Sequence, residues 1–326
     1  MAYPGKLDLS IEALKASVQG HYGLEVQVWN VRNGYMSTTV VLQSQHERYV
    51  LKVYRKEEVD PKQIEFGLLL NDTYEQAGLP VASRFSLCED ERHFFVLWRH
   101  LEGRVFSPGA LGELEAAGQM LGQIHMASPS VSGDLVWPPM WDEVCDTLVL
   151  LWGKMDGMDA VADWIADFQI RLARLQEAIR TPDLETLPRA VIHGDYRAQN
   201  LLFREGQVVG ILDLDTARGA PRLFDLAYAL VFFQAVIAEA PLDLDERGCF
   251  LKGYNQKNKL SERERDLLPD FLELALMRGL TLWMQIAYLD RVNASMEGWF
   301  PPYLDLLSRV HQWAPDLAGF ALDEGG

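Results

Sequence analysis

Alternating apolar and polar positions run through the first hundred residues of the chain and predict a β-sheet. Five stretches have the length and apolar content of single strands, and alternation is clearest in the first and third. They are residues 26–31, 38–44, 49–54, 81–87 and 94–98. Helical spacing occurs in residues 10–22, which are followed by Gly23, and in residues 61–77. The pattern therefore predicts a small antiparallel lobe over residues 1–99.

From about residue 100 onwards the spacing of the apolar positions becomes helical. Residues 107–108, Ser-Pro, are a good helix start because proline is favoured at the first helical position. Leu114, Leu121 and Ile124 then share one helical face. Residues 142–180 are mostly helical in pattern, so this part of the chain predicts a helical layer.

Two further helices are expected nearer the C-terminus. Residues 261–264, Ser-Glu-Arg-Glu, form a capping box that opens a helix running towards Asp290. The longest apolar run, residues 226–238, is too short to span a bilayer and predicts a buried helix. Residues 100–326 are therefore expected to form a larger, mainly helical lobe, and the whole chain an α+β, bilobal fold.

Composition and charge narrow the classes of partner. The 326 residues include 30 basic and 47 acidic side chains, which gives a net charge of −17. Nucleic acids and anionic membranes bind through positive charge, so neither is an expected partner. The three cysteines are odd in number, far apart and without metal-type spacing, and the N-terminus lacks an apolar signal core. We expect reduced thiols in a cytoplasmic protein.

The most informative stretch of the chain surrounds a predicted hairpin. An apolar approach leads to His193-Gly194-Asp195, and Asn200 follows five residues after the aspartate. Two short apolar runs, residues 201–203 and 208–212, are joined by a Glu-Gly turn, and the second run ends at Asp213. Such a hairpin is expected to hold Asp195, Asn200 and Asp213 at one mouth.

These residue types suit phosphoryl transfer from ATP. The reaction needs a proton acceptor for the attacking hydroxyl, which Asp195 could supply, and hard oxygen ligands for Mg²⁺, which Asn200 and Asp213 could supply. Arg197 is placed to meet the charge of the γ-phosphate, whereas His193 is expected to brace the turn. Asp, Asn and Gly are also common in ordinary solvated turns, but their order, spacing and strand context agree here.

Lys52 is a lysine within the apolar strand 49–54, and a buried ammonium group needs a partner or a ligand. The best candidate is Glu65 in the predicted helix 61–77, with Glu58 and Glu75 as poorer choices. An edge-strand lysine that reaches solvent along its own stem is the alternative.

Three other features allow two interpretations each. His125 is expected to be a packing histidine and not a catalytic one. Asp225 could cap the start of a helix or pin the loop around Asp195, and a structural role is favoured. The aromatic C-terminal region, with Arg278, Trp283 and several later aromatic residues, could line an acceptor pocket or cage an ammonium group, but core packing is the more common explanation.

Taken together, the motifs resemble those of the aminoglycoside phosphotransferase/choline kinase-like family, which has the protein-kinase fold. The resemblance spans nearly the whole chain and is most specific at His193-Gly194-Asp195, at Asn200 and at residues 211–215, Ile-Leu-Asp-Leu-Asp. It implies that ATP and Mg²⁺ are the cofactors, that Asp195 is the catalytic base and that Asn200 and Asp213 are the metal ligands. It also implies a phosphate-anchoring pair of Lys52 and Glu65.

The resemblance further implies a nucleotide site in the first lobe. The turn at residues 32–37 would cover the phosphates, with Ser37 as a contact. The backbone of the hinge from Trp98 to Leu101, which includes His100, would meet the adenine. Two departures are visible: many members have a histidine where this chain has Arg197, and the phosphate-covering turn has a single glycine. Asp215 corresponds to an acidic position of some members that could assist the metal or the acceptor.

The expected function is transfer of the γ-phosphate of ATP to a hydroxyl of a small molecule, such as homoserine, choline, an aminoglycoside or a related amino alcohol or sugar. Residues 250–254 and 275–278 are similar to homoserine kinase-like members, and residues 212–215 to bacterial stress-response Ser/Thr kinases. A protein Ser/Thr kinase is therefore one alternative. A nucleotide-binding pseudokinase is the other, although the presence of Lys52, Asp195, Asn200 and Asp213 argues against it.

Overall fold

The structure is a computed structural model that describes residues 8–34, 37–128, 140–154, 159–179, 186–234, 241–289 and 300–322. The chain divides into two compact units. The first combines Met1–Gly103 with Val209–Asp215, and the second combines Arg104–Val208 with Thr216–Gly326. The expected boundary between residues 99 and 100 lies four residues earlier, and the return of residues 209–215 to the first unit was not foreseen.

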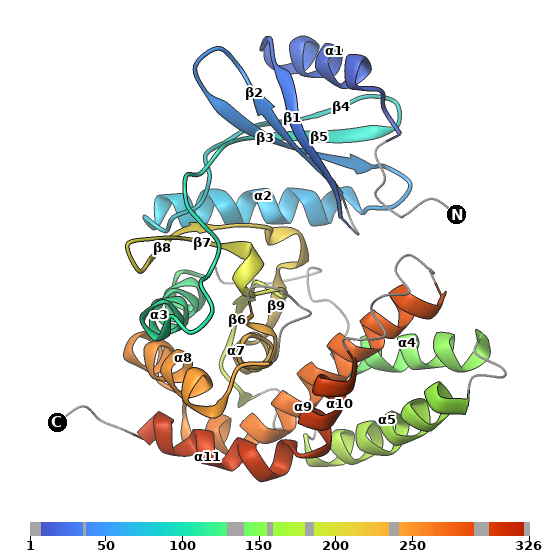
Figure 1. The fold of residues 1–326 in the computed structure, drawn as a ribbon, viewed down its shortest axis with the longest axis vertical. Coiled ribbons are helices and arrows are strands. Elements are labelled where there is room, and N and C mark those ends of the chain that lie inside the picture. The colour runs from blue at the N-terminus through green and yellow to red at the C-terminus, as the bar shows by residue number, and fades with distance from the viewer. Residues whose placement is uncertain are drawn as a thin grey trace. The chain divides into compact units, whose positions relative to one another are not determined.

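The first unit contains a five-stranded antiparallel sheet with the strand order β1-β2-β3-β5-β4 (Figure 1). Its strands are β1 (Gln27–Asn33), β2 (Thr38–Gln43), β3 (Arg48–Arg55), β4 (Arg84–Glu89) and β5 (His93–Arg99). Consecutive strands β1, β2 and β3 pair with their neighbours, as expected for short connections. The small antiparallel lobe predicted from the alternating pattern is thus confirmed.

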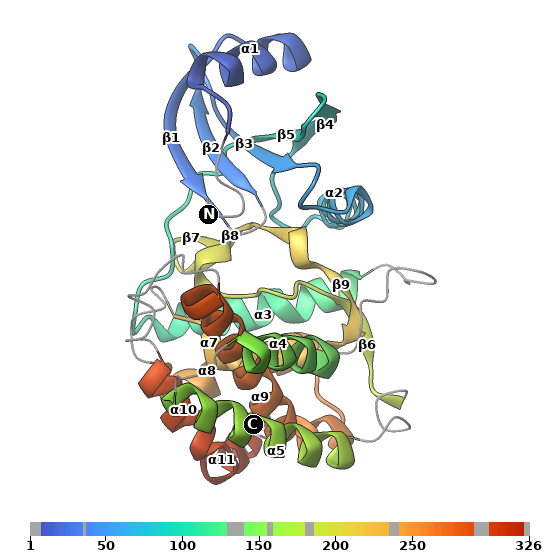
Figure 2. The same ribbon diagram turned by 90° about the vertical axis from the view of Figure 1, so that its right-hand side faces the viewer.

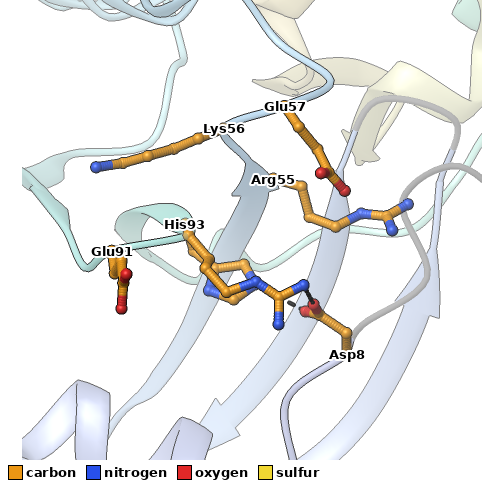
Figure 3. A pocket seen from close by; sticks show the side chains of 7 residues that line it. Asp8, Arg55, Lys56, Glu57, Glu91 and His93 are labelled. Carbon is orange, nitrogen blue, oxygen red and sulfur yellow. Dashed lines mark hydrogen bonds and ion pairs between the residues drawn. The ribbon is translucent and has the colours of Figure 1, made fainter.

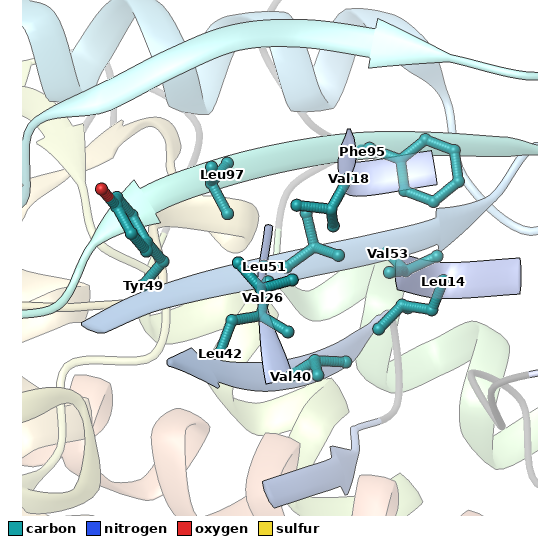
Figure 4. Close-up of a cluster of buried hydrophobic side chains, with 10 residues drawn as sticks. All are labelled: Leu14, Val18, Val26, Val40, Leu42, Tyr49, Leu51, Val53, Phe95 and Leu97. Atoms are coloured by element: carbon teal, nitrogen blue, oxygen red, sulfur yellow. The ribbon is translucent and has the colours of Figure 1, made fainter. Parts of the chain in front are cut away.

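Each face of this sheet is covered by a helix. On one face, α1 (Ile11–Tyr22) places Leu14 and Val18 against apolar side chains of the strands (Figure 4). On the other face, α2 (Pro61–Gln76) places Ile64 and Leu68 in a second buried cluster. Because strand side chains alternate between faces, the two clusters use alternate residues of β3.

Capping residues fix where both helices begin. The Ser10 hydroxyl accepts a hydrogen bond from the backbone N–H of Ala13, 3.1 Å away, at the start of α1. At the start of α2, the Asp60 carboxylate accepts from the N–H of Lys62 at 2.9 Å. These bonds satisfy backbone donors that a helix leaves open at its first turn.

The fourth strand begins later than the sequence predicted. The stretch 81–87 was expected to be a strand, but β4 starts at Arg84. The preceding residues are engaged elsewhere in the first unit: the Pro80 carbonyl accepts from the N–H of Ile211 at 2.8 Å, and Val81 forms a parallel bridge with Ile211. The long-range pairing with Ile211 therefore delays the start of β4, although local propensity favours a strand from Val81.

The second unit is mainly helical (Figure 2). Its helices are α3 (Leu111–Ala127), α4 (Met140–Lys154), α5 (Asp159–Ala178), α7 (Arg222–Phe232), α8 (Leu244–Lys257), α9 (Glu262–Met284), α10 (Phe300–Ser308) and α11 (Val310–Leu322). The capping box predicted at the start of α9 is present, with Ser261 and Glu264 bonded reciprocally. A π-helical turn, Gln285–Leu289, follows α9, and Asp290 lies outside the described residues.

The first helix of this unit does not start where the sequence predicted. The helix start expected at residues 107–108 is a turn, and α3 begins at Leu111 after Gly109, whose φ is +76°. That left-handed conformation cannot continue a right-handed helix. The Glu113 carboxylate instead accepts the N–H of Ser107 at 3.1 Å and pairs with Arg104.

Four short strands complete the described part of the fold. β6 (Arg189–Ile192) pairs with β9 (Arg218–Pro221), and the sequence pattern did not predict this pairing. β7 (Leu201–Arg204) pairs with β8 (Gln207–Ile211), which leads the chain into its 209–215 segment. The turn residues Glu205 and Gly206 have φ of 51° and 77°, as a two-residue hairpin turn with right-handed strand twist requires.

No helix among the described residues has an apolar stretch long enough to cross a bilayer. Within the predicted buried helix 226–238, α7 ends at Phe232 and all residues of α7 are buried; residues 235–238 lie outside the described part of the chain.

Candidate active site

The loop of residues 193–200, hereafter the Asp195 loop, lies in the second unit between β6 and β7. Gly194 has a φ of +79°, and a Cβ added there would collide with the carbonyl oxygen of Thr216. Glycine is therefore needed for both the backbone conformation and the close approach. His193 accepts a bond from the N–H of Asp195 through Nδ1 at 3.4 Å, and its carbonyl accepts from the Thr216 hydroxyl at 3.0 Å. This matches the bracing role expected of His193.

The carboxylate of Asp195 is held at both oxygens. Oδ1 accepts from the Tyr228 hydroxyl at 2.9 Å, and Oδ2 accepts from Asn200 Nδ2 at 2.9 Å. The guanidinium of Arg197 lies on the same side, with Nε 3.1 Å from Oδ2. Burial, together with the charge of Asp195, raises the pKa of Tyr228, so this phenol remains a hydrogen-bond donor at neutral pH. Asp195, Arg197 and Asn200 are thus brought together.

A buried aspartate holds the Asp195 loop from the side of α7. Asp225 accepts from the backbone N–H groups of His193 at 2.7 Å and Gly194 at 3.0 Å, and its Oδ2 lies 3.1 Å from Nε2 of His125. α7 has no side-chain cap, so the helix-cap interpretation of Asp225 is wrong and the pinning interpretation is confirmed. His125 is buried in the core as expected, and it also bonds the Tyr254 hydroxyl at 2.9 Å.

Lys52 lies within a cluster of oxygen atoms in the first unit. Its Nζ is 2.7 Å from Oδ1 of Asp213 and 2.8 Å from Oδ2 of Asp215, and the Tyr54 hydroxyl donates to Asp215 at 3.0 Å. Burial by itself would lower the pKa of Lys52, but the two carboxylates outweigh it and hold that pKa well above 10.5. Burial raises the pKa of Asp215. The Lys52 charge lowers it, but the negative charge of Asp213 acts in the same direction as burial, so the pKa lies above its ordinary value.

Asp213 has an unusual backbone conformation. Its φ of +65° lies in the left-handed region, which residues with a side chain rarely adopt. The segment then continues into a 3₁₀ turn, Leu214–Thr216. Strain of this kind persists where surrounding contacts fix it, and it occurs often at functional sites. The Asp213 side chain is also the more exposed of the two carboxylates, at 43% against 19% for Asp215.

Glu65 does not join Lys52, contrary to the expected pair. Its side chain is exposed, because Ile64 and Leu68 turn the buried face of α2 into the apolar cluster and Glu65 lies 100° further around the helix. The side chain of α2 that reaches the 209–215 segment is Gln63, which donates through Nε2 to the carbonyl oxygen of Asp215. Asp213 and Asp215 occupy the position next to Lys52 that was assigned to Glu65.

The expected nucleotide contacts lie in the first unit. Ser37 is buried, and its carbonyl accepts the N–H of Gly34 at 2.8 Å; the residues between them lie outside the described part. In the predicted hinge, the N–H groups of Arg99 and His100 already donate to protein carbonyls at 2.9 and 3.1 Å. The indole Nε1 of Trp98 is buried without a hydrogen-bond partner in the described part of the chain, which leaves a donor that a ligand could satisfy.

A hollow of about 160 Å³ at the edge of the first unit has a different character (Figure 3). Asp8 pairs with two other side chains that line it: Arg92 lies 2.9 Å from Asp8, and Nε2 of His93 lies 2.7 Å from the same carboxylate. None of the expected site residues lines it. These contacts bind Asp8 to the start of β5, and the hollow is not a candidate active site.

The predicted aromatic C-terminal region contributes to the core and, through Arg278, to the surroundings of the Asp195 loop. Phe232, Trp283 and Tyr303 pack together and are buried, so core packing is confirmed for them. Arg278 lies next to the Asp195 loop: its guanidinium is 5.6 Å from the ring centre of Tyr228, and Nη1 is 3.4 Å from the carbonyl oxygen of Gly194. Trp299 lies outside the described residues.

Sequence reasoning missed two phenols of the site. Tyr54 stands two residues after Lys52 on the same strand, so strand alternation alone places both side chains on one face, and this signal was available. Tyr228 gave no such signal, because its contact with Asp195 depends on how α7 packs below the loop.

Solved structures of small-molecule kinases share this architecture. A microcompartment-associated aminopropanol kinase superposes with a TM-score of 0.67 at 16% identity, covering 93% of this chain and 98% of that one. Similarity at this level of identity establishes the fold. The α+β, bilobal, protein-kinase-like fold expected from the sequence is confirmed.

Sequence comparison gives the family. A sequence model of the phosphotransferase enzyme family matches residues 30–257, and the chain belongs to this family. It is 25% identical over 311 residues to a homoserine kinase of Phenylobacterium zucineum, covering 91% of this chain and 92% of that protein. It is 27% identical over 304 residues to stress response kinase A of Escherichia coli O157:H7, covering 88% and 84% of the two.

Proposed function

We propose that the protein is an ATP- and Mg²⁺-dependent kinase that phosphorylates a hydroxyl of a small amino acid or amino alcohol. The observation that carries the proposal is the Asp195 carboxylate, which Tyr228 and Asn200 orient through both oxygens. A carboxylate held in this way is suited to align an attacking hydroxyl and accept its proton. The Asp225 contacts keep the Asp195 loop in place and so limit the reorganisation that the reaction needs.

The available donors fit Mg²⁺, which prefers carboxylate and amide oxygens. Asn200 turns its amide nitrogen to Asp195, so Oδ1 is the atom that it can offer to a cation. Asp213 would supply a carboxylate oxygen from the exposed side of its segment. A bound Mg²⁺ would supply positive charge against the charge of the phosphates.

The nucleotide is assigned to the first unit. Lys52 would contact the phosphates as a point charge, since its ammonium remains protonated beside Asp213 and Asp215. The buried indole N–H of Trp98 would donate to the base or the ribose. Ser37 and His100 remain candidate contacts on the grounds of their position alone.

Arg278 favours an acceptor that carries a carboxylate. A guanidinium 5.6 Å from the Tyr228 ring lies close to the residue that bonds Asp195, and guanidinium groups bind carboxylates through paired hydrogen bonds. A hydroxy amino acid such as homoserine or serine has both groups that this arrangement would bind. The relative named homoserine kinase supports this class, whereas the relative named stress response kinase A supports a protein hydroxyl as the second candidate.

The test is an ATP-consumption screen of the purified chain with Mg²⁺, with Asp195→Asn as the matched blank. The acceptors would be paired by the presence of a carboxylate, for example homoserine against 3-aminopropanol and serine against ethanolamine, with choline, an aminoglycoside and a generic protein added. We expect turnover with a carboxylate-bearing acceptor, and a loss of about a hundredfold or more in Asp195→Asn. ADP affinity should stay within about twofold, since this residue is assigned to the acceptor.

Other outcomes would redirect the proposal. Turnover confined to the protein acceptor would favour a protein kinase, and turnover confined to carboxylate-free amines would remove the role assigned to Arg278. ADP binding without turnover across the panel would favour a pseudokinase. Full activity in Asp195→Asn would contradict the assignment of the base.

A further inference from the structure

The side of α2 that reaches the 209–215 segment carries no carboxylate. Gln63 donates through its amide to the carbonyl of Asp215, and one turn later a Cβ added at Gly67 would lie 3.1 Å from the carbonyl oxygen of Leu214. A longer side chain at Gly67 would have to displace that backbone. Glu65 projects elsewhere and is exposed. The helix therefore offers Lys52 no anionic partner from this side.

Asp215 is bonded as a fixed partner of Lys52. Its side chain is 19% exposed, and it engages the lysine through Oδ2 at 2.8 Å and the Tyr54 hydroxyl through Oδ1 at 3.0 Å. Its backbone carbonyl is held by Gln63. These contacts come from β3 and α2, and they fix the carboxylate at both its oxygens and its main chain.

The geometry points to Asp215 as the positioning residue of Lys52, in the place that a helix glutamate takes in protein kinases. This assignment rests on the proposed function, in which Lys52 contacts the phosphates of ATP. Asp213, half-exposed and two residues earlier, is then the carboxylate left for the metal. One short segment, Val209–Asp215, would supply both the metal ligand and the carboxylate that positions Lys52. No charged side chain of α2 would then be needed to position the lysine.

The two carboxylates can be told apart by measuring ADP affinity calorimetrically on the full-length chain, in EDTA and in Mg²⁺. Asp215→Asn is expected to weaken ADP binding about tenfold in both conditions, the equivalent of one charge-assisted hydrogen bond. Asp213→Asn removes the same charge and is expected to weaken binding in Mg²⁺ alone. Because loss of a negative charge by itself favours an anionic ligand, weaker binding by Asp215→Asn in EDTA would report lost positioning.

Two further variants complete the design. Glu65→Gln should bind ADP as the wild type does, and Tyr54→Phe should weaken binding about threefold in both conditions, since it removes one neutral donor from Asp215. The Tyr54 variant keeps the test decisive if Asp215→Asn does not fold.

Each failure has a distinct meaning. If Asp215→Asn or, where that variant is unfolded, Tyr54→Phe binds ADP like the wild type in EDTA, the assignment is wrong. It is also wrong if Glu65→Gln shows the tenfold loss. If the wild type binds no ADP in either condition, the proposed function itself fails, and the positioning role falls with it.

Discussion

At the residue scale, Asp225 shows how a single buried charge can determine the shape of a loop. It is fully buried and accepts three hydrogen bonds, two from the backbone of the Asp195 loop and one from His125. Burial alone would raise the pKa of Asp225, but the hydrogen bond and charge of His125, with the neighbouring His193, outweigh it. The pKa therefore lies below the ordinary value of 3.8.

Asp225→Asn should destabilise the protein by roughly 3 kcal/mol at neutral pH, because the amide turns a donor towards groups that are themselves donors. A carboxylate with a depressed folded-state pKa stabilises the fold above its unfolded pKa and loses that contribution as the pH falls through the folded value. The difference between wild type and variant should thus be constant above about pH 5 and shrink below 3.8.

Urea unfolding midpoints at pH 7, 5, 4 and 3 check this prediction. Asp243→Asn is a suitable control, since Asp243 caps α8 on an exposed surface and bonds a single backbone N–H. A difference between wild type and Asp225→Asn that grows as the pH is lowered would contradict the expected direction of the pH dependence.

At the element scale, the contact between α3 and α8 depends on two glycines. A Cβ at Gly118 would collide with the carbonyl oxygen of Phe250, and one at Gly253 with the carbonyl oxygen of Glu115. The helix backbones therefore touch directly, which brings Tyr254 of α8 within reach of His125 on α3. That contact supports the histidine that bonds Asp225.

Gly118→Ala should accordingly destabilise the protein by about 1–3 kcal/mol, because the helices must separate to admit the methyl group. Gly112→Ala is the matched control in the same helix, where nothing lies within 4 Å of the added Cβ. Its effect should be neutral or stabilising by up to about 1 kcal/mol, from helix propensity. Equal unfolding midpoints for the two variants would show that the close contact is not required.

The elements that local signals determine were predictable from the sequence. Ser10 caps α1, the Ser261–Glu264 box opens α9 and the Glu-Gly turn forms the β7–β8 hairpin. The predictions were wrong or incomplete where contacts between distant residues determine the element. β4 starts late because Val81 pairs with Ile211, and the β6–β9 pair joins segments about thirty residues apart.

The same distinction between local signals and distant contacts applies to the site residues. Spacing alone placed Asp195 and Asn200 together, because they lie five positions apart in one loop. The partner of Lys52 could not be found in this way. Helix periodicity allowed Glu65, but the contact was decided by residues 213 and 215, which lie more than 150 positions further along the chain.

At the scale of the whole molecule, the net charge of −17 sets how stability should respond to salt. Like charges in excess repel one another in the compact state. Exposed ion pairs such as Arg48–Glu102 and Arg309–Asp305 oppose this only weakly, since each contributes about 0–1 kcal/mol. Raising the ionic strength shortens the screening length from about 30 Å at 0.01 M to about 10 Å at 0.1 M, so the repulsion should weaken more than the short-range pairs do.

We therefore expect the urea midpoint at pH 8 to rise between about 0.01 M and 0.3 M NaCl, because the shorter Debye length screens the long-range repulsion. The rise should be smaller at pH 5.5, because protonation brings the net charge towards zero near the isoelectric point of 4.8. Potassium chloride serves as the control for ion-specific binding, since screening depends on ionic strength and not on the cation. A midpoint that falls with salt at pH 8 would mean that attractive pairs, and not the excess of acidic groups, dominate the surface electrostatics of this chain.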